Sequence, residues 1–584
     1  MMTTHSVHPK KNRAKVLLTS VFGPYAQDDA YGSRRINPME LYHNQVTRFQ
    51  GAFSLRMFHR SFGLMLIQSN IDAPCTLLDF PTLDRFVQEI ARNDYDVVGI
   101  SAIIPNIGKV VKMCRLIRAH LPGAAIVIGG HVANKEDIDA IVDADHIVRG
   151  DGVAWFRRYL GQEVQAPIRH PMAYSGSGTR ILGVPFREKP GDTAAILIPS
   201  VGCPVGCNFC STSALFGGKG HFINFYETGD ALFEVMVQLE RRLMVQSFFV
   251  MDENFLLHRK RALRLLELMQ THNKSWSLYV FSSARVLRSY TMEQLVRLGV
   301  SWVWMGLEGK TSGYAKIRNV DTHALVHRLQ SHGIRVLGSS ILGLEDHRVE
   351  DMPRIIDEAV SYGTDFHQFM LYTPNAGTPL YATHKAAGTL LDEAEFSPAD
   401  AHGQYRFNYR HQHIPAGMEE LFLHRAFQRD FEVNGPSLAR LIRTLLTGWH
   451  KYRRHPDPRI RNRYLREVAP LRSSYAGAVW AMRRWFARNT PMARQMDRLL
   501  RDIYRTFGPR TRLIAPLVGR VLLITMRREE KRMARGWTYE PKTFYEKNPG
   551  ALAVESATAP DRKPSADGGA REVHPAPAAC RGLS

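Results

Sequence analysis

Short apolar runs alternate with helical patterns in two successive series along this chain, and this alternation restricts the folds open to it more than any other feature. The first series covers about residues 14–161 and the second about residues 194–374. Alternation of strands and helices is typical of parallel α/β sheets. A chain of 584 residues is too long for one ordinary core. The two series therefore predict two separate α/β domains.

The second series predicts a partial barrel, because six strand–helix units fit within fewer than two hundred residues. Beyond it the pattern becomes helical and basic, and the last residues are rich in Ala, Pro, Gly and Ser, which is typical of disorder. We predict an α/β protein with six parts: a flexible N-terminus (1–13), a Rossmann-like domain (14–165), a linker (166–193), a partial (β/α)6 barrel (194–400), a helical basic region (401–548) and a disordered tail (549–584).

Small residues stand where three strands of the first series end. Open α/β sheets bind ligands outside the carboxyl ends of their strands, and small residues there let a large flat ligand approach. A single glycine of this kind often does no more than end its strand. Three such ends in succession favour a ligand site, which would be formed by Gly99, Ser101, Gly129, Gly130, Gly150 and Gly152.

Three cysteines, Cys203, Cys207 and Cys210, lie within eight residues in "VGCPVGCNFCST". They follow the first strand of the predicted barrel, where barrel enzymes place their chemistry. Their spacing favours metal ligation. A structural zinc site normally needs a second cysteine or histidine pair, and none follows here. Three thiolates on a four-iron cube leave one iron open, so the pattern predicts a reactive cluster.

The other cysteines, Cys75, Cys114 and Cys580, are scattered and do not indicate a disulfide framework. An apolar stretch near the N-terminus is short enough to be the first strand and does not require a signal peptide. No run of about twenty apolar residues indicates a transmembrane helix. We therefore expect a cytoplasmic protein.

"CPVGCNFC" after the first barrel strand resembles the signature of the radical S-adenosylmethionine (radical SAM) superfamily, and the resemblance continues along the barrel in "MDENF", "SSAR", "GLEG" and "SSILGLE". "MDENF" departs from the family's Gly-Gly-Glu segment and is similar to the acidic versions of the cobalamin-dependent branch. The resemblance implies a [4Fe-4S] cluster on the three cysteines and SAM on its open iron. It places Phe209 near the adenine, Asp252 and Glu253 at the amino group, and Ser283, Arg285, Glu308 and Gly343 at the carboxylate, the ribose and the fifth strand end.

The first domain resembles the cobalamin-binding domain that precedes many radical SAM barrels. The resemblance rests on "VVGISAIIPN", "IVIGGHVA" and "HIVRGDG", and it implies that the strand-end residues Gly99, Ser101, Gly129, Gly130, Gly150 and Gly152 bind cobalamin. The Asp-x-His-x-x-Gly motif that supplies a histidine to cobalt in other cobalamin proteins is absent. We therefore expect cobalamin to bind without that histidine.

The basic charge is concentrated between residues 437 and 536, which contain 25 Lys and Arg against 6 Asp and Glu in a chain of net charge +22. Solvated helices, nucleic acid and an anionic membrane surface are the three interpretations of this segment. Trp480, Trp485 and Phe486, together with the apolar "RLIAPLVGRVLLITM", favour a membrane surface over nucleic acid. We thus expect a peripheral membrane location at the inner face.

Together these resemblances imply a cobalamin-dependent radical SAM methyltransferase that generates a 5′-deoxyadenosyl radical and methylates an unactivated carbon. The substrate would be lipid-like, isoprenoid-like or a secondary metabolite, and a flavodoxin- or ferredoxin-type reductant would supply electrons. One alternative is a cobalamin radical SAM enzyme that closes a ring or joins two carbons without methylation. The other is a non-catalytic corrinoid- or metal-binding regulator.

Overall fold

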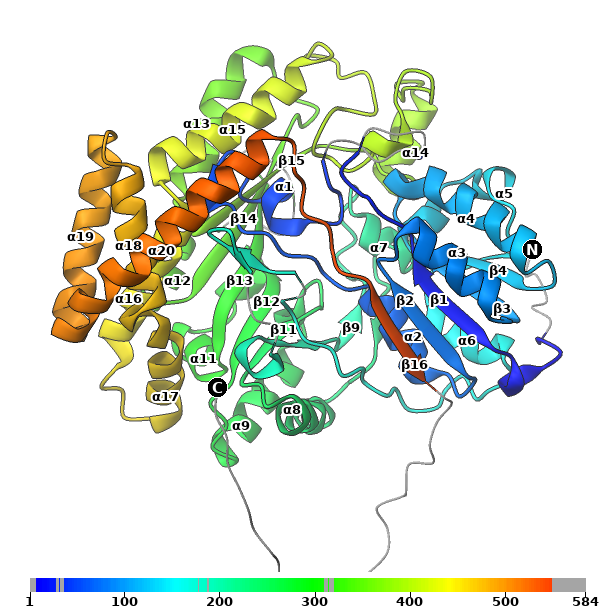
Figure 1. Ribbon diagram of the computed structural model, residues 1–584, viewed down its shortest axis with the longest axis horizontal. Helices are drawn as coiled ribbons and strands as arrows, with labels where there is room; N and C mark the ends of the chain where they lie inside the picture. The colour runs from blue at the N-terminus through cyan, green and yellow to red at the C-terminus, as the bar shows by residue number, and fades with distance from the viewer. Residues whose placement is uncertain are drawn as a thin grey trace, which may run out of the picture. The chain divides into compact units, whose positions relative to one another are not determined.

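The computed structural model describes residues 7–27, 31, 36–176, 178–185, 189–308, 314 and 320–548. Residues 1–550 form one compact unit, and residues 551–584 are separate from it. The expected disordered tail (549–584) and residues 1–6 lie outside the described residues. Within the large unit, two six-stranded sheets carry the predicted α/β series (Figure 1).

The first sheet has the strand order β16-β2-β1-β3-β4-β5, and its five N-terminal strands are parallel. β1 and β2 are buried along their whole length, as expected of strands covered on both faces. Each predicted strand of the first series is present, which confirms the α/β class. The elements are β1 (Val16–Ser20), α2 (Phe62–Asn70), β2 (Cys75–Asp79), α3 (Leu83–Arg92), β3 (Val97–Ser101), α4 (Ile107–His120), β4 (Ala125–Gly129), α5 (Ile138–Ile141), β5 (His146–Ile147) and α6 (Gly152–Tyr159).

Part of the segment expected to be flexible packs against this sheet. The backbone amide of His8 donates to the carbonyl oxygen of Tyr159 at the end of α6, at 2.7 Å. The Nζ atom of Lys10 lies 2.5 Å from an Asp96 carboxylate oxygen. Residues 8–13 therefore differ from the expectation, because backbone and ion-pair contacts hold them to the first domain.

The second sheet has the order β15-β14-β13-β12-β11-β8, with parallel neighbours throughout. Its first and last strands are not paired with each other, as in a partial barrel. The helices pack outside around an apolar core. The elements are β8 (Ala195–Leu197), α7 (Ser211–Leu215), α8 (Gly229–Leu243), β11 (Ser247–Val250), α9 (Arg259–Thr271), β12 (Ser277–Ser283), α10 (Ala284–Arg288), α11 (Met292–Arg297), β13 (Val300–Glu308), α12 (Thr322–Gln330), β14 (Arg335–Leu342), α13 (Met352–Ser361), β15 (Phe366–Leu371) and α14 (Pro379–Ala386).

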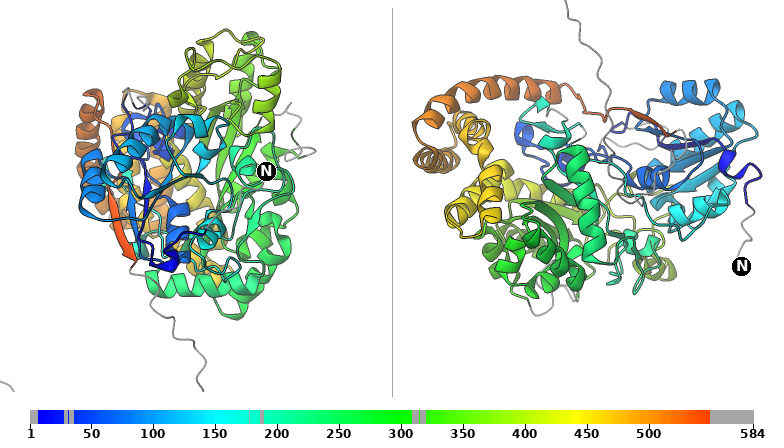
Figure 2. Two further views of the ribbon diagram at one scale, coloured as in Figure 1. Left: turned by 90° about the vertical axis from the view of Figure 1, so that its right-hand side faces the viewer. Right: turned by 90° about the horizontal axis from the view of Figure 1, so that it is seen from below.

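Six helices follow the barrel and pack beside it (Figures 1 and 2). α18 and α20 cross closely because glycines stand at their contact: a Cβ on Gly519 would meet Trp480, and one on Gly477 would meet Val518. The helices are α15 (Met418–Asn434), α16 (Ser437–Tyr452), α17 (Pro458–Glu467), α18 (Ser474–Trp485), α19 (Thr490–Phe507) and α20 (Pro509–Ala534). No helix among the described residues is long and apolar enough to cross a membrane.

The aromatic residues that the sequence suggested for a membrane surface are in fact packed inside this region. The ring of Phe486 stacks on Phe53 with centroids 5.0 Å apart, and Trp485 meets the same ring edge-on at 5.8 Å. Trp480 covers the crossing of α18 and α20. These side chains therefore serve packing, and the membrane interpretation cannot rest on them.

The region expected to be helical throughout ends in a strand. After α20 the chain crosses to the first sheet, and β16 (Phe544–Asn548) pairs antiparallel with β2 (Figure 1). On the way, Glu540 accepts a hydrogen bond from the backbone amide of Tyr25 at 3.0 Å. The C-terminal region is thus joined to both sheets.

Candidate functional site

The three cysteines of the motif lie on the loop between β9 (Ser200–Val201) and α7. Cys203, Cys207 and Cys210 are half-buried, and none of the three is in a disulfide among the described residues. Cys210 caps α7 by accepting from the amide of Ser213, and the Ser213 hydroxyl donates to the Cys203 carbonyl oxygen at 2.8 Å. Ser213 therefore fixes the two ends of the loop relative to each other.

Glycines shape this loop. Gly206 has φ +62°, and a Cβ there would collide with the backbone of Lys219. Gly202 has φ +83°, and a Cβ added there would collide with the side chain of Phe216. Side chains at these two positions would be both strained and crowded, so the glycines of the motif are required by the loop conformation.

Burial and neighbouring thiols control the ionisation of the cysteines. Burial, with smaller contributions from Cys207, Cys210 and Glu253, raises the pKa of Cys203 to about 11. Metal ligation requires the thiolates, so a cation at this position would stabilise the form that burial disfavours. In the described part of the chain, no three His, Cys, Asp or Glu side chains are close enough to share a single metal ion. A four-iron cube binds its thiolates at separate corners and does not need them to meet at one ion.

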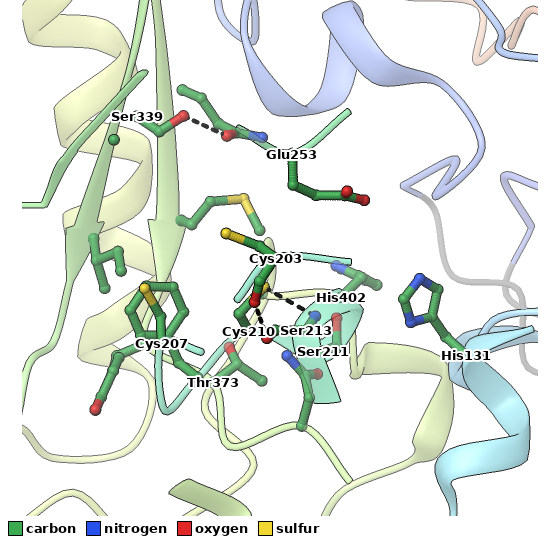
Figure 3. Close-up of a pocket in the computed structure, with 18 of the residues that line it drawn as sticks. His131, Cys203, Cys207, Cys210, Ser211, Ser213, Glu253, Ser339, Thr373 and His402 are labelled. Atoms are coloured by element: carbon green, nitrogen blue, oxygen red, sulfur yellow. Dashed lines mark hydrogen bonds between the residues drawn. The ribbon is translucent and has the colours of Figure 1, made fainter. Parts of the chain in front are cut away.

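The cysteine loop lines a cavity of about 690 Å³ at the carboxyl ends of the barrel strands, here called the cysteine cavity (Figure 3). Ser283 ends β12 and Glu308 ends β13, and both are buried side chains on its wall. Glu308 has φ +56°, and the pairing of β13 with β14 shifts register beside it. The barrel thus presents two of the predicted SAM-site residues to the three cysteines.

Phe209 lines the same cavity beside two tyrosines. Its ring meets Tyr314 edge-on at 5.2 Å and Tyr372 at 6.1 Å. The Tyr314 hydroxyl donates to the Tyr372 hydroxyl at 3.0 Å, and Asn208 donates to the same oxygen at 3.3 Å. This aromatic wall is suited to the flat face of an adenine. The motif identified Phe209, whereas nothing in the sequence pointed to Tyr314 or Tyr372.

Asp252 and Glu253 follow β11 and have opposite environments. Asp252 is buried, and its carboxylate accepts from the Ser200 hydroxyl at 2.5 Å and from Arg261 at 2.7 Å. The Glu253 carboxylate faces the cysteine cavity, and its buried Oε2 atom has no hydrogen-bond partner among the described residues (Figure 3). Burial, reinforced by Asp252, raises the pKa of Glu253 to about 7. An ammonium group beside Glu253 would offset the cost of burying its carboxylate charge. Glu253 therefore fits the role of holding the SAM amino group better than Asp252 does.

Two other predicted SAM residues do not line the cavity. Arg285 is exposed on the first turn of α10, because the helix begins immediately after β12 and turns this side chain outward. Gly343 is buried against Phe407, and its carbonyl oxygen accepts from the Tyr409 hydroxyl at 3.1 Å. Gly343 therefore has a packing role, and Arg285 does not line the cysteine cavity.

All six small strand-end residues of the first sheet line a second cavity of about 400 Å³, here called the glycine cavity. Gly129 leaves open space, since a Cβ there would meet only the Val148 carbonyl oxygen at 3.9 Å. Gly130 has φ +83°, and its Cβ would clash with Ala102. The strand ends that carry them thus line one concave surface, and its binding of a flat ligand stays a prediction.

The cysteine and glycine cavities meet. A third cavity of about 600 Å³ lies between them, and Glu253 and His131 line all three. His131 directly follows Gly130, is half-buried, and its Nδ1 atom has no hydrogen-bond partner in the described part of the chain. No motif in the sequence pointed to His131, although its position after the glycine pair was a usable signal. The absence of the cobalt-ligating motif therefore does not leave the cavity without a histidine.

Comparisons with known proteins agree with this geometry. Residues 53–160 match the family model of the B12 binding domain. The chain carries a B12-binding domain.

Among curated proteins, the bacteriochlorophyllide d C-12(1)-methyltransferase of Chlorobaculum tepidum is 25% identical over 329 residues, which is 53% of this chain and 70% of that protein. An uncharacterized methyltransferase of Pyrococcus horikoshii is 23% identical over 352 residues, 53% of this chain and 74% of its own. Among solved structures, the radical SAM methyltransferase TsrM from Kitasatospora setae, with cobalamin and a [4Fe-4S] cluster bound, covers 78% of this chain and 100% of its own at 15% identity and a TM-score of 0.44.

The family model confirms the resemblance of the first domain to cobalamin-binding domains, and both curated relatives are methyltransferases. These relatives indicate an enzyme, and the B12-binding domain indicates cobalamin as a cofactor. A [4Fe-4S] cluster and SAM are the further cofactors predicted from the cysteine motif. The residues at the two cavities fit these groups: three thiolates and a buried unpartnered carboxylate on one side, and a concave row of small residues on the other.

Proposed function

We propose that this enzyme transfers a methyl group to an unactivated carbon of an apolar substrate. The observation that carries the proposal is the continuity of the cysteine and glycine cavities, which share Glu253 and His131 as lining residues. Two cofactors bound in them would both have access to one substrate. When bound, the cluster with SAM would supply radical chemistry and cobalamin would supply the methyl group.

The residues of the chain hold and enclose these groups. Cys203, Cys207 and Cys210 would ligate three irons and leave the fourth open. Glu253 would bind the SAM amino group by a charge-assisted hydrogen bond. The strand ends at Gly129 would seat the corrin ring. Because most of these side chains are buried or half-buried, the site keeps water from a reactive radical.

Anaerobic reconstitution tests the proposal. Wild type should bind about four irons per chain. With cobalamin as methyl acceptor and a flavodoxin- or ferredoxin-type reductant, it should release both 5′-deoxyadenosine and S-adenosylhomocysteine from SAM. The triple variant Cys203→Ala, Cys207→Ala, Cys210→Ala should lose the irons and the deoxyadenosine. Cys114→Ala, which removes a thiol outside the loop, is the matched control and should keep both.

The SAM-derived products and the bound metal distinguish the alternative functions. Deoxyadenosine without S-adenosylhomocysteine would favour the ring-closing or carbon-joining enzyme. Stoichiometric zinc with no iron–sulfur absorbance would contradict cluster chemistry. Retained corrinoid with no SAM cleavage would favour the non-catalytic regulator.

We also propose that α20 contacts an anionic membrane surface. Leu513, Leu517, Val521 and Ile524 form an exposed row along this helix and are 53–72% exposed. Arg520 lies within the row and is exposed. An apolar stripe flanked by cations complements the acyl boundary and headgroups of anionic lipid. The exposed row supports this proposal, in place of the packed aromatic residues.

A further inference from the structure

The inside of the barrel below the cysteine cavity is hollow. Barrels of this type usually fill their interior with layers of side chains. Here a cavity of about 950 Å³ remains on the inner face of the sheet, and we call it the lumen cavity. Its volume exceeds that of the cysteine cavity, so the barrel has room for a ligand as large as most that proteins bind in pockets.

Aromatic rings line the lumen cavity. Phe281 and Trp304 stack with centroids 4.9 Å apart, at 26° between ring planes. Trp302 contacts Phe366 at 5.3 Å and Tyr279 at 6.4 Å. Tyr279, Phe281, Trp302 and Trp304 are only half-buried, so parts of their rings face the cavity. Apolar surface left facing water is unfavourable, and a contiguous patch of it indicates a binding site.

The lumen cavity adjoins the reactive site through one pair of rings. Phe281 and Trp304 line both the lumen cavity and the cysteine cavity. Beside them a chain of hydrogen bonds forms the floor of the cysteine cavity: Trp304 Nε1 donates to Ser339 Oγ at 2.8 Å, and Ser339 donates to Gln368 at 2.7 Å. The Phe281–Trp304 pair and this hydrogen-bond chain therefore form the shared wall of the two cavities, and a substrate group that reaches the cofactors from the lumen must pass beside them.

The lumen cavity opens at the opposite end of the barrel from the cofactors. Its remaining lining comes from strand starts, the helical region, the linker and residues 42 and 57, and it includes Gly191, Gln246 and Ser474. Met244 at this end is 78% exposed. A ligand can therefore enter from below without passing the cysteine cavity or the glycine cavity.

We propose that the lumen cavity binds the body of the substrate, and that the substrate class is large, apolar, planar ring systems. The proposal rests on the proposed function, since it assumes that the reacting carbon projects past Phe281 and Trp304 toward the cofactors. Flat rings stack on aromatic side chains face to face or edge-on at about 4.5–7 Å, and the lumen offers four such side chains. A flexible linear chain would gain less from these faces and would lose more conformational entropy on binding.

The proposal is tested by blocking the opening of the lumen cavity with a bulky side chain. The binding of a defined probe, 1-pyrenebutyrate, to the reconstituted holoenzyme is then measured. Wild type should bind one probe per chain and lose part of its tryptophan fluorescence. Ser474→Trp places a bulky ring at the exposed mouth and should weaken binding at least tenfold. Ser361→Trp, at an exposed helix end on α13 outside the cavity, is the matched control and should bind as wild type does.

Competition tests the ligand class: palmitate should displace the probe at least tenfold less well than anthraquinone-2-carboxylate, a planar competitor. Equal displacement would overturn the planar class, and unchanged binding by Ser474→Trp, or no binding by wild type, would overturn the site. Ser474→Trp should still release deoxyadenosine from SAM, because its cluster is untouched. If wild type binds the probe but cleaves no SAM, the proposed function fails while the lumen site stands.

Discussion

At the end of β11, two neighbouring carboxylates differ in what surrounds them. Asp252 is satisfied by Ser200 and Arg261, and Glu253 faces the cysteine cavity with an unpartnered oxygen. The first carboxylate therefore holds the strand end in place, and the second is available to a ligand. Substitution should separate these roles.

We predict that Glu253→Gln weakens SAM binding roughly 10- to 100-fold, because a hydrogen bond to a charged group contributes about 1.5–3 kcal/mol. The stability of the protein should not fall. Asp252→Asn should instead destabilise the fold by roughly 3–5 kcal/mol, since it leaves the buried Arg261 without its counter-charge. SAM binding to reconstituted protein and denaturant unfolding measure the two effects. A loss of stability in Glu253→Gln equal to that in Asp252→Asn would refute the division.

The strand-end glycines allow a second test at this scale. Gly129→Leu should reduce retained cobalamin at least tenfold, because Gly129 lines the glycine cavity and its Cβ position is open, so the added side chain would enter the ligand space. Gly123→Leu is the control, since Gly123 also has open space but does not line that cavity. Bound corrinoid is measured by absorbance after gel filtration. Equal retention by both variants would exclude the glycine cavity as the cobalamin site.

At the scale of elements, the sequence predicts most of what surrounds the site. The strands of both series are found where the apolar runs place them, because a buried parallel strand needs a continuous apolar run. The cysteine loop and its place after the first barrel strand follow from the motif. Side-chain direction was less predictable: Arg285 and Gly343 lie near the right strand ends but are turned outward or packed.

Residues from distant segments were not predictable at all. Gln45 reaches the cysteine cavity from a segment with no motif, and Tyr314 packs behind its wall on Phe209; only the folded chain brings them there. β16 gave no usable signal, since its "FYEKN" is half-buried at a sheet edge and alternates weakly. Trp480 was misread because a Trp beside Arg has the same pattern on a membrane surface and at a helix crossing.

The exposed row on α20 yields a prediction at the same scale. Wild type should sediment with vesicles containing phosphatidylglycerol and much less with neutral phosphatidylcholine vesicles, since each nearby Lys or Arg contributes about 1 kcal/mol. Leu517→Glu with Val521→Glu should reduce that binding at least tenfold. Leu421→Glu with Val433→Glu, an exposed apolar pair on α15, should leave it unchanged. Loss of binding in both double variants, or in neither, would rule out α20 as the contact.

At the scale of the whole molecule, the C-terminal segment ties the helical region to the first sheet. Arg60 lies over the ring of Phe544 at 4.2 Å and pairs with Glu546 at 2.6 Å. The strand β16 covers the edge of β2, which would otherwise present unpaired backbone groups. The first domain therefore depends on residues from the far end of the chain.

Deletion of residues 537–584 should destabilise the protein by a few kcal/mol, at roughly 1 kcal/mol for each net backbone hydrogen bond lost, and should promote aggregation through the open edge of β2. Deletion of residues 551–584 alone, which removes only the separate unit, should change neither property. Denaturant unfolding and light scattering measure both. Equal stability of the two shortened proteins would show that β16 is dispensable.

The pairing of β16 with β2 also sets the order of events during synthesis. β2 leaves the ribosome early, whereas its antiparallel neighbour is among the last described residues to be translated. At about 5–20 residues per second, the nascent first domain waits on the order of tens of seconds or longer with one sheet edge uncovered. Neighbouring nascent chains on one messenger RNA can pair through such an edge. Completion of the first sheet thus comes late in synthesis, and the folding yield of this protein depends on how well that edge is shielded until β16 emerges.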